Sequence, residues 1–77
     1  MNRIIGFLLS EGFIPKYPTE SFRLWFESSS GEDWIIVFYS GREYKAEFIK
    51  FYTKHIVRTS KYSATKATDI IAWIQAQ

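Results

Sequence analysis

The chain of 77 residues contains no cysteine, two prolines, four glycines and one histidine. The lack of cysteine excludes disulfides, cysteine-ligated zinc, iron–sulfur clusters and thiol nucleophiles, and it is compatible with a reducing compartment. Because His55 is the single histidine, multi-histidine metal sites and two-histidine acid–base pairs cannot form within one chain. Neither a phosphate-binding glycine loop nor a GxSxG nucleophile elbow occurs. These absences predict a protein without a catalytic site, metal ion or cofactor.

Long hydrophobic runs are missing as well. The apolar start of the chain ends at Ser10, Glu11 and Gly12, so it is too short for a secretory signal and lacks a cleavage site. No stretch approaches the roughly 20 apolar residues that a membrane span requires. We therefore expect an intracellular, cytoplasmic location and no membrane partner.

Aromatic side chains are abundant, with seven Phe, five Tyr and three Trp. Each of them can bury roughly 150–250 Å² of surface, which lets a short chain build a core without disulfides or metals. The length leaves room for one domain, and we expect it to cover residues 1–77.

Two amphipathic helices are expected at the ends of the chain. Residues 2–12 carry an apolar stripe, with Asn2 as the N-cap and Gly12 as a left-handed residue after the last turn. Residues 64–77 carry a second apolar stripe without a helix breaker, and Ser63 can cap it. Each helix has only one apolar face, so each must pack on another element.

Three segments between the helices predict a three-stranded antiparallel β-meander, and with it an α+β fold. Residues 21–28 alternate between apolar and polar side chains, with Phe22 on the side expected to face the helices. Residues 34–39 are continuously apolar, as in a central strand that is buried on both faces. Residues 42–48 alternate again after a short glycine turn. The predicted order is helix, three strands, helix.

Two segments lack a single periodic pattern. In residues 42–58, aromatic and β-branched side chains favour a strand followed by irregular chain. The spacing of the apolar residues and the absence of Gly, Pro, Asn and Asp also fit one long helix, so both interpretations stay open. Nearer the N-terminus, Pro15 and Pro18 predict that residues 14–20 form a connection.

The aromatic residues exceed what one sheet face can bury. Trp25 lies on the opposite side of its strand from Phe22, beside Arg23, and Tyr39 and Tyr44 are expected on the same open side. Trp, Tyr and Arg are enriched in the hot spots of protein interfaces. Arg23, Trp25, Tyr39 and Tyr44 therefore predict a surface that, with the adjoining basic strip of residues 50–66, docks on a protein partner in an inhibitor or adaptor role. Self-association through this surface, base stacking and simple packing of Trp25 are the alternatives.

Charge is distributed unevenly along the chain. Residues 1–41 hold three basic and five acidic side chains, a net of −2, whereas residues 42–77 hold seven basic and three acidic side chains, a net of +4. Basic groups interleaved with aromatic and hydroxyl groups can contact phosphates and stack on bases. Nucleic-acid binding is therefore the alternative function, with an acidic protein partner or simple solubility as the other interpretations of this strip. The residues that would form it are Lys50, Lys54, His55, Arg58, Lys61 and Lys66.

A catalytic role for His55 defines a third class of function. It would need a carboxylate or hydroxyl partner, and Glu43 and Glu47 are near it only in sequence. The acidic turn residues Glu32 and Asp33 supply too few oxygen ligands for a divalent ion. The sequence therefore predicts a non-catalytic binding or regulatory module.

Overall fold

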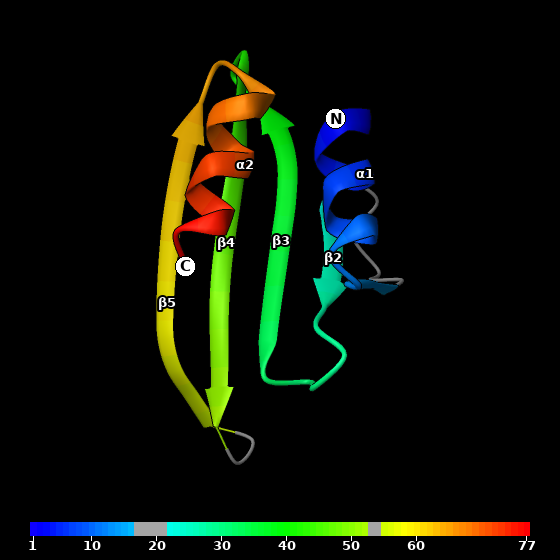
Figure 1. The fold of residues 1–77 in the computed structure, drawn as a ribbon. Helices are drawn as coiled ribbons and strands as arrows, with labels where there is room; N and C mark the ends of the chain where they lie inside the picture. The colour runs from blue at the N-terminus through cyan, green and yellow to red at the C-terminus, as the bar shows by residue number, and fades with distance from the viewer. Residues whose placement is uncertain (17–21, 53–54) are drawn as a thin grey trace.

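Each strand of the sheet lies beside the strand that precedes it in the chain. The structure is a computed structural model that describes residues 1–16, 22–52 and 55–77. In these residues a five-stranded antiparallel sheet with the order β1-β2-β3-β4-β5 packs against two helices (Figure 1). The helices are α1 (Asn2–Ser10) and α2 (Ala67–Gln75). The strands are β1 (Ile14–Lys16), β2 (Leu24–Glu27), β3 (Asp33–Ser40), β4 (Glu43–Tyr52) and β5 (His55–Ala64).

The α+β class and the two terminal helices are confirmed, but the predicted three-stranded meander has too few strands. Strand β1 lies within residues 14–20, where a connection was expected, and its Pro15 pairs with Phe26 of β2. Proline lacks a backbone N–H, and it is tolerated at the edge of a sheet because an edge strand needs only one set of ladder hydrogen bonds. The prolines therefore place this segment at an edge without excluding it from the sheet.

The described residues of segment 42–58 are not helical, and the chain does not become irregular after one short strand. Strand β4 continues to Tyr52, and β5 pairs with it antiparallel from His55 to Ala64, with a bulge between Lys50 and Phe51. The β-branched and aromatic residues of this stretch suit a pleated sheet, and long-range pairing between β4 and β5 selects the strand over the helix. The absence of Gly, Pro, Asn and Asp from this stretch is therefore explained by two long strands and not by one long helix.

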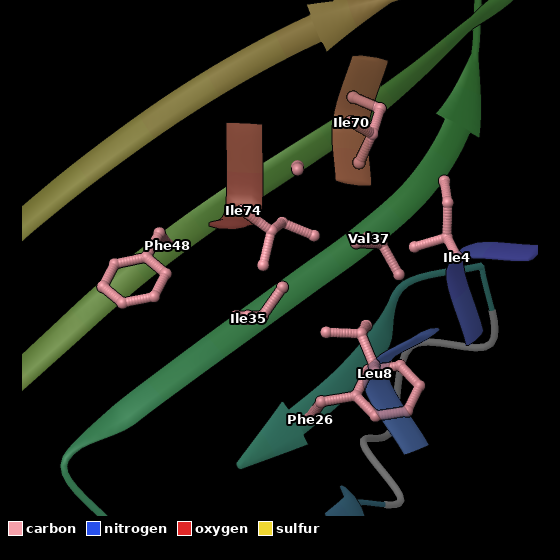
Figure 2. Close-up of a cluster of buried hydrophobic side chains, with 9 residues drawn as sticks. Ile4, Leu8, Phe26, Ile35, Val37, Phe48, Ile70 and Ile74 are labelled. Atoms are coloured by element: carbon pink, nitrogen blue, oxygen red, sulfur yellow. The ribbon is translucent and has the colours of Figure 1, made fainter. Parts of the chain in front are cut away.

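One hydrophobic core lies between the helices and one face of the sheet. Figure 2 shows Ile4 and Leu8 of α1 beside Phe26 and Val37, and Ile74 of α2 beside Phe48. Because all these side chains belong to one buried cluster, both helices cover the same face of the sheet. The buried members of the cluster are Ile4, Leu8, Phe26, Ile35, Val37, Ala46, Phe48, Ile70 and Ile74.

Helix α1 ends in the manner that the sequence predicts. Gly12 has a φ of 86°, in the left-handed region. Its N–H donates to the Leu9 carbonyl at 3.1 Å, and the N–H of Phe13 donates to the Leu8 carbonyl at 3.0 Å, which is the hydrogen-bond pattern of a Schellman motif. Phe13 also packs against the core. This end therefore turns the chain back toward the sheet and into β1.

The starts of the helices differ from the prediction. Met1, not Asn2, is the N-cap of α1, and Lys66, not Ser63, is the N-cap of α2. Neither N-cap makes a side-chain hydrogen bond. Ser63 belongs to β5 because strand pairing extends to Ala64, three residues before α2 begins. Packing of the apolar stripes, not capping chemistry, therefore sets where these helices begin.

The turn between β3 and β4 contains a strained residue. Ser40 pairs with Glu43, so Gly41 and Arg42 form a two-residue hairpin loop. Their φ values are 61° and 68°, and positive φ at both central residues is the requirement of a type I′ turn. Glycine accepts this conformation freely, but Arg42 has a Cβ that disfavours it.

Replacing Arg42 by glycine should therefore stabilise the protein. We expect Arg42→Gly to raise the free energy of unfolding by about 0.5–1 kcal/mol, since the strain removed exceeds the added freedom of the unfolded chain. The matched change Gly41→Ala should lower it by about 1 kcal/mol. Urea denaturation of the three proteins measures both effects, and a less stable Arg42→Gly protein would contradict the turn assignment.

Candidate functional site

The face of the sheet opposite the helices carries a second set of apolar side chains. Neighbouring residues of a strand point to opposite faces, so the cluster residues Ile35 and Val37 leave Trp34, Ile36 and Phe38 of β3 on the other face. The pairing places Trp25 and Glu47 on either side of Ile36. We call this surface the helix-free face. Its described apolar members are Ile14, Phe22, Trp25, Trp34, Ile36, Phe38, Ile49, Phe51 and Ile56.

Aromatic rings on the helix-free face contact one another edge to face. The Trp25 and Trp34 ring centroids lie 5.7 Å apart at 84°, and those of Trp34 and Phe51 lie 6.0 Å apart at 67°. Phe22 and Phe38 form another such pair, with 6.1 Å between centroids and 86° between planes. Each contact of this kind contributes about 0.5–1.5 kcal/mol beyond the burial of area. The rings therefore form a layer of contacting side chains over β2, β3 and β4.

The aromatic layer buries the residue at its centre. Ile36 is 1% exposed although neither α1 nor α2 lies on its side of the sheet, and Ile35 on the helix-covered side is 0% exposed. In the ladder Ile36 lies directly opposite Trp25, with Trp34 and Phe38 two residues away on its own strand. The lateral packing of side chains within one sheet face thus replaces the cover that a helix would give.

Charged side chains complete the face and largely neutralise one another. The Arg23 guanidinium carbon lies 4.8 Å from the Phe38 ring centroid, and its Nη1 lies 3.7 Å from Oε2 of Glu47. On the other side of Glu47, its Oε1 lies 3.9 Å from Nζ of Lys61. Lys16 Nζ and Glu27 Oε2 form a closer pair at 3.0 Å. The face is therefore mainly apolar, and its carboxylates Glu47, beside Ile36, and Glu27 are both paired with cations.

Parts of the helix-free face remain open to solvent. Phe22 is 63% exposed, Ile56 is 62% exposed and Ile14 is 47% exposed. In addition, the indole N–H of Trp25 is buried and meets no hydrogen-bond acceptor in the described part of the chain. A buried donor without an acceptor costs about 1–3 kcal/mol, and such costs are typical of sites where function competes with stability.

The structure places the predicted partner-binding residues on two different faces. Arg23 and Trp25 lie together on the helix-free face, close to the aromatic layer. Tyr39 and Tyr44 contact each other with 4.9 Å between ring centroids, but Tyr44 packs against the helix-covered core. The expectation that both tyrosines share the open face is wrong, because Tyr39 alternates in step with Val37 and lies directly opposite Tyr44.

The sequence pattern also predicts the wrong face for Phe22, which was expected on the helix-covered face and lies on the helix-free face. The alternation of residues 21–28 puts it on the face of Phe26, but β2 begins only at Leu24. Ahead of the strand the chain does not follow the pleat, and the Phe22 ring contacts Phe38 on the helix-free face. Sequence reasoning also missed Trp34, which it treated as part of a strand buried by other layers on both faces. Counting alternate residues from Trp25 across the hairpin would have found it.

The predicted basic strip is not one surface. Lys50 and Arg58 lie opposite each other on the side of the helices, and Lys50 Nζ lies 3.6 Å from Oδ1 of Asp33. Lys61 lies on the helix-free face beside Glu47. His55 is the first residue of β5, and Lys66 follows its last residue, Ala64, by two positions. The length of β5, roughly 30 Å for ten residues, therefore separates them. Lys54 lies outside the described residues.

His55 does not meet the carboxylates that are near it in sequence. It pairs with Tyr52, whereas Glu47 pairs with Lys61, six residues further along β5 and roughly 20 Å away. Within the described ranges no three acidic or histidine side chains gather as metal ligands. Neither α1 nor α2 is long and apolar enough to cross a membrane. Comparisons of the chain with family models, curated proteins and solved structures found no match.

The burial of Ile36 by the aromatic layer can be tested by removing one methylene group. We expect Ile36→Val to lower the free energy of unfolding by about 0.5–1.5 kcal/mol, the cost of the same change in a closed core. Ile35→Val, on the helix-covered side, is the matched control and should lose a similar amount. Denaturant titration of both proteins decides the question. An unchanged stability for Ile36→Val alone would show that the helix-free face is solvated at its centre.

Proposed function

We propose that the chain is a non-catalytic protein-binding module that docks on a partner protein through its helix-free face. The observation that carries the proposal is the layer of contacting aromatic rings on a sheet face without a helix, bordered by exposed Phe22 and Ile14. Aromatic residues and arginine dominate the binding energy of protein interfaces. Arg23, held over the Phe38 ring, adds a cation that can anchor a polar group of the partner at the rim. An inhibitor or adaptor role inside the cell is part of this proposal.

The charge balance favours a protein over a nucleic acid as the partner. Phosphate backbones are bound by cations that have no competing carboxylates, whereas Glu47 lies between Arg23 and Lys61, and Glu27 pairs with Lys16. A surface that is mainly apolar and whose carboxylates are paired with cations suits a protein partner. The partner surface should accordingly be apolar, with few net charges.

Exposed apolar residues on the two faces provide matched variants for the test. Phe22→Ser with Ile14→Thr alters the helix-free face, and Leu9→Ser with Tyr39→Thr alters residues of similar exposure elsewhere, since Leu9 is 50% and Tyr39 56% exposed. We expect a partner to bind the wild type and the control variant, and to bind the face variant at least about tenfold more weakly. Capture from cells identifies the partner, and titration calorimetry with the purified partner measures the three affinities.

Two results would refute the proposed function. One is a partner that binds the face variant as tightly as the control variant. The other is sedimentation showing that the wild type is a dimer which the Phe22→Ser and Ile14→Thr changes convert to a monomer, because the face would then serve self-association. Near-identical unfolding curves for the two variants ensure that the comparison measures binding and not folding.

Nucleic-acid binding is checked separately with labelled RNA and DNA at low and moderate salt. We expect weak binding with a shallow salt dependence, because Lys50 and Lys61 already face carboxylates and the basic residues lie on different faces. A steep salt dependence that Arg58→Ala reduces would contradict this expectation. It would make the alternative function the better one.

A further inference from the structure

The two edges of the sheet are built differently. The β1 edge is three residues long and has Pro15 at its middle, and short length and proline are both features that prevent an edge strand from pairing with another chain. The β5 edge is ten residues long and contains neither proline nor glycine. One edge is therefore blocked, whereas the β5 edge has a register shift before Arg58 and an uninterrupted ladder from Arg58 to Ala64, which is the part that can be extended.

The outer side of β5 is accessible along most of its length. Among the described strands β5 pairs only with β4, so the backbone N–H and C=O groups of every second residue face outward. Arg58, Thr59, Lys61 and Tyr62 are all exposed. The strand is also held in place, because the Tyr62 ring stacks on Trp73 of α2 with 5.5 Å between centroids and 9° between planes. A fixed strand edge binds another strand without first having to become ordered.

The charged side chains of β5 are all basic, so the strand favours an acidic binding partner. The strand contains Arg58 and Lys61 and no carboxylate, and no acidic residue occurs between Glu47 and Asp69. Arg58 makes no ion pair with any residue that the structure describes, and the Lys61 side chain is 72% exposed. A second copy of the chain would bring basic residues beside basic residues, which disfavours pairing. An acidic strand would instead gain an ion pair with Arg58 and place a second carboxylate beside Lys61, which is mostly exposed although its Nζ lies 3.9 Å from Oε1 of Glu47.

Strand geometry specifies where the acidic groups must lie. Arg58 pairs with Lys50 on the helix-covered face, whereas Lys61 pairs with Glu47 on the helix-free face. In an added strand, side chains three residues apart also point to opposite faces, so two such carboxylates would meet Arg58 and Lys61 together. We propose that the β5 edge accepts an extended segment of a partner protein that carries two carboxylates three residues apart. The site shares Lys61 with the helix-free face, but its backbone edge is not part of that face, and the inference goes beyond the proposed function.

The test uses the full chain and two synthetic peptides of equal composition. Both peptides are rich in Thr and Val, and they carry two glutamates either three or two residues apart. Fluorescence anisotropy measures the affinities, and amide hydrogen exchange reports where the peptide binds. We expect the peptide with the three-residue spacing to bind several-fold more tightly and to protect alternate amides of β5 from exchange.

Charge reversal locates the contacts. Arg58→Glu with Lys61→Glu should weaken binding of the three-residue-spacing peptide by about tenfold, because two exposed ion pairs become two repulsive ones. Lys66→Glu, a reversal of the same kind outside the strand, is the matched control and should have little effect. Phe22→Ser should leave peptide binding unchanged, so failure of this proposal and failure of the proposed function are distinguishable.

Any of three results would overturn the inference. The first is a lack of binding or of protection at β5 amides in the wild type. The second is equal binding of the two peptides, or equal weakening by Lys66→Glu, since both indicate unspecific charge attraction. The third is a dimer in sedimentation whose formation protects the β5 amides, because the edge would then be occupied by a second copy.

Discussion

The pairing of β3 with strands on both of its sides is the constraint on which the rest of the structure depends. Its register with β2 and β4 aligns Ile35 and Val37 with Phe26, Ala46 and Phe48, and the apolar stripes of both helices pack on this row. The alternation of the pleat then sends Trp34, Ile36 and Phe38 to the opposite face. A one-residue slip in this register would exchange the two faces.

The aromatic layer shields the sheet face that the helices do not cover. Both helices lie on one side of the five-stranded sheet, so among the described residues no helix covers the other side. Large rings that contact each other edge to face can shield Ile36 from within the sheet itself. This shielding is incomplete, because Phe22 and Ile14 stay exposed at the margin of the face. The buried Trp25 N–H also has no acceptor among the described residues. The same features that let the short chain fold therefore support a role in binding.

Strand geometry also determines which of the basic residues share a surface. The sequence places seven of the ten basic residues after residue 41, which suggests one basic surface. In the sheet, residues an odd number of positions apart point to opposite faces, so Arg58 and Lys61 separate, and Lys50 and Lys61 each lie near a carboxylate. What remains is a long strand edge with basic side chains on both sides. The linear strip is thus divided between the two faces of the sheet.

The sequence by itself determined the local elements that short-range physics controls. These are the α+β class, the apolar stripes of both helices, the left-handed Gly12 after α1 and the hairpin before Glu43. Only the tertiary structure decided the number of strands, because the choice between helix and strand after Arg42 depends on pairing with a distant segment. It also decided which side chains share a face: Tyr39 and Tyr44 joined the core side, and Phe22 joined the open side. The physical reason is that alternation specifies two faces but not which one the helices will cover, and it holds only where the backbone is actually paired.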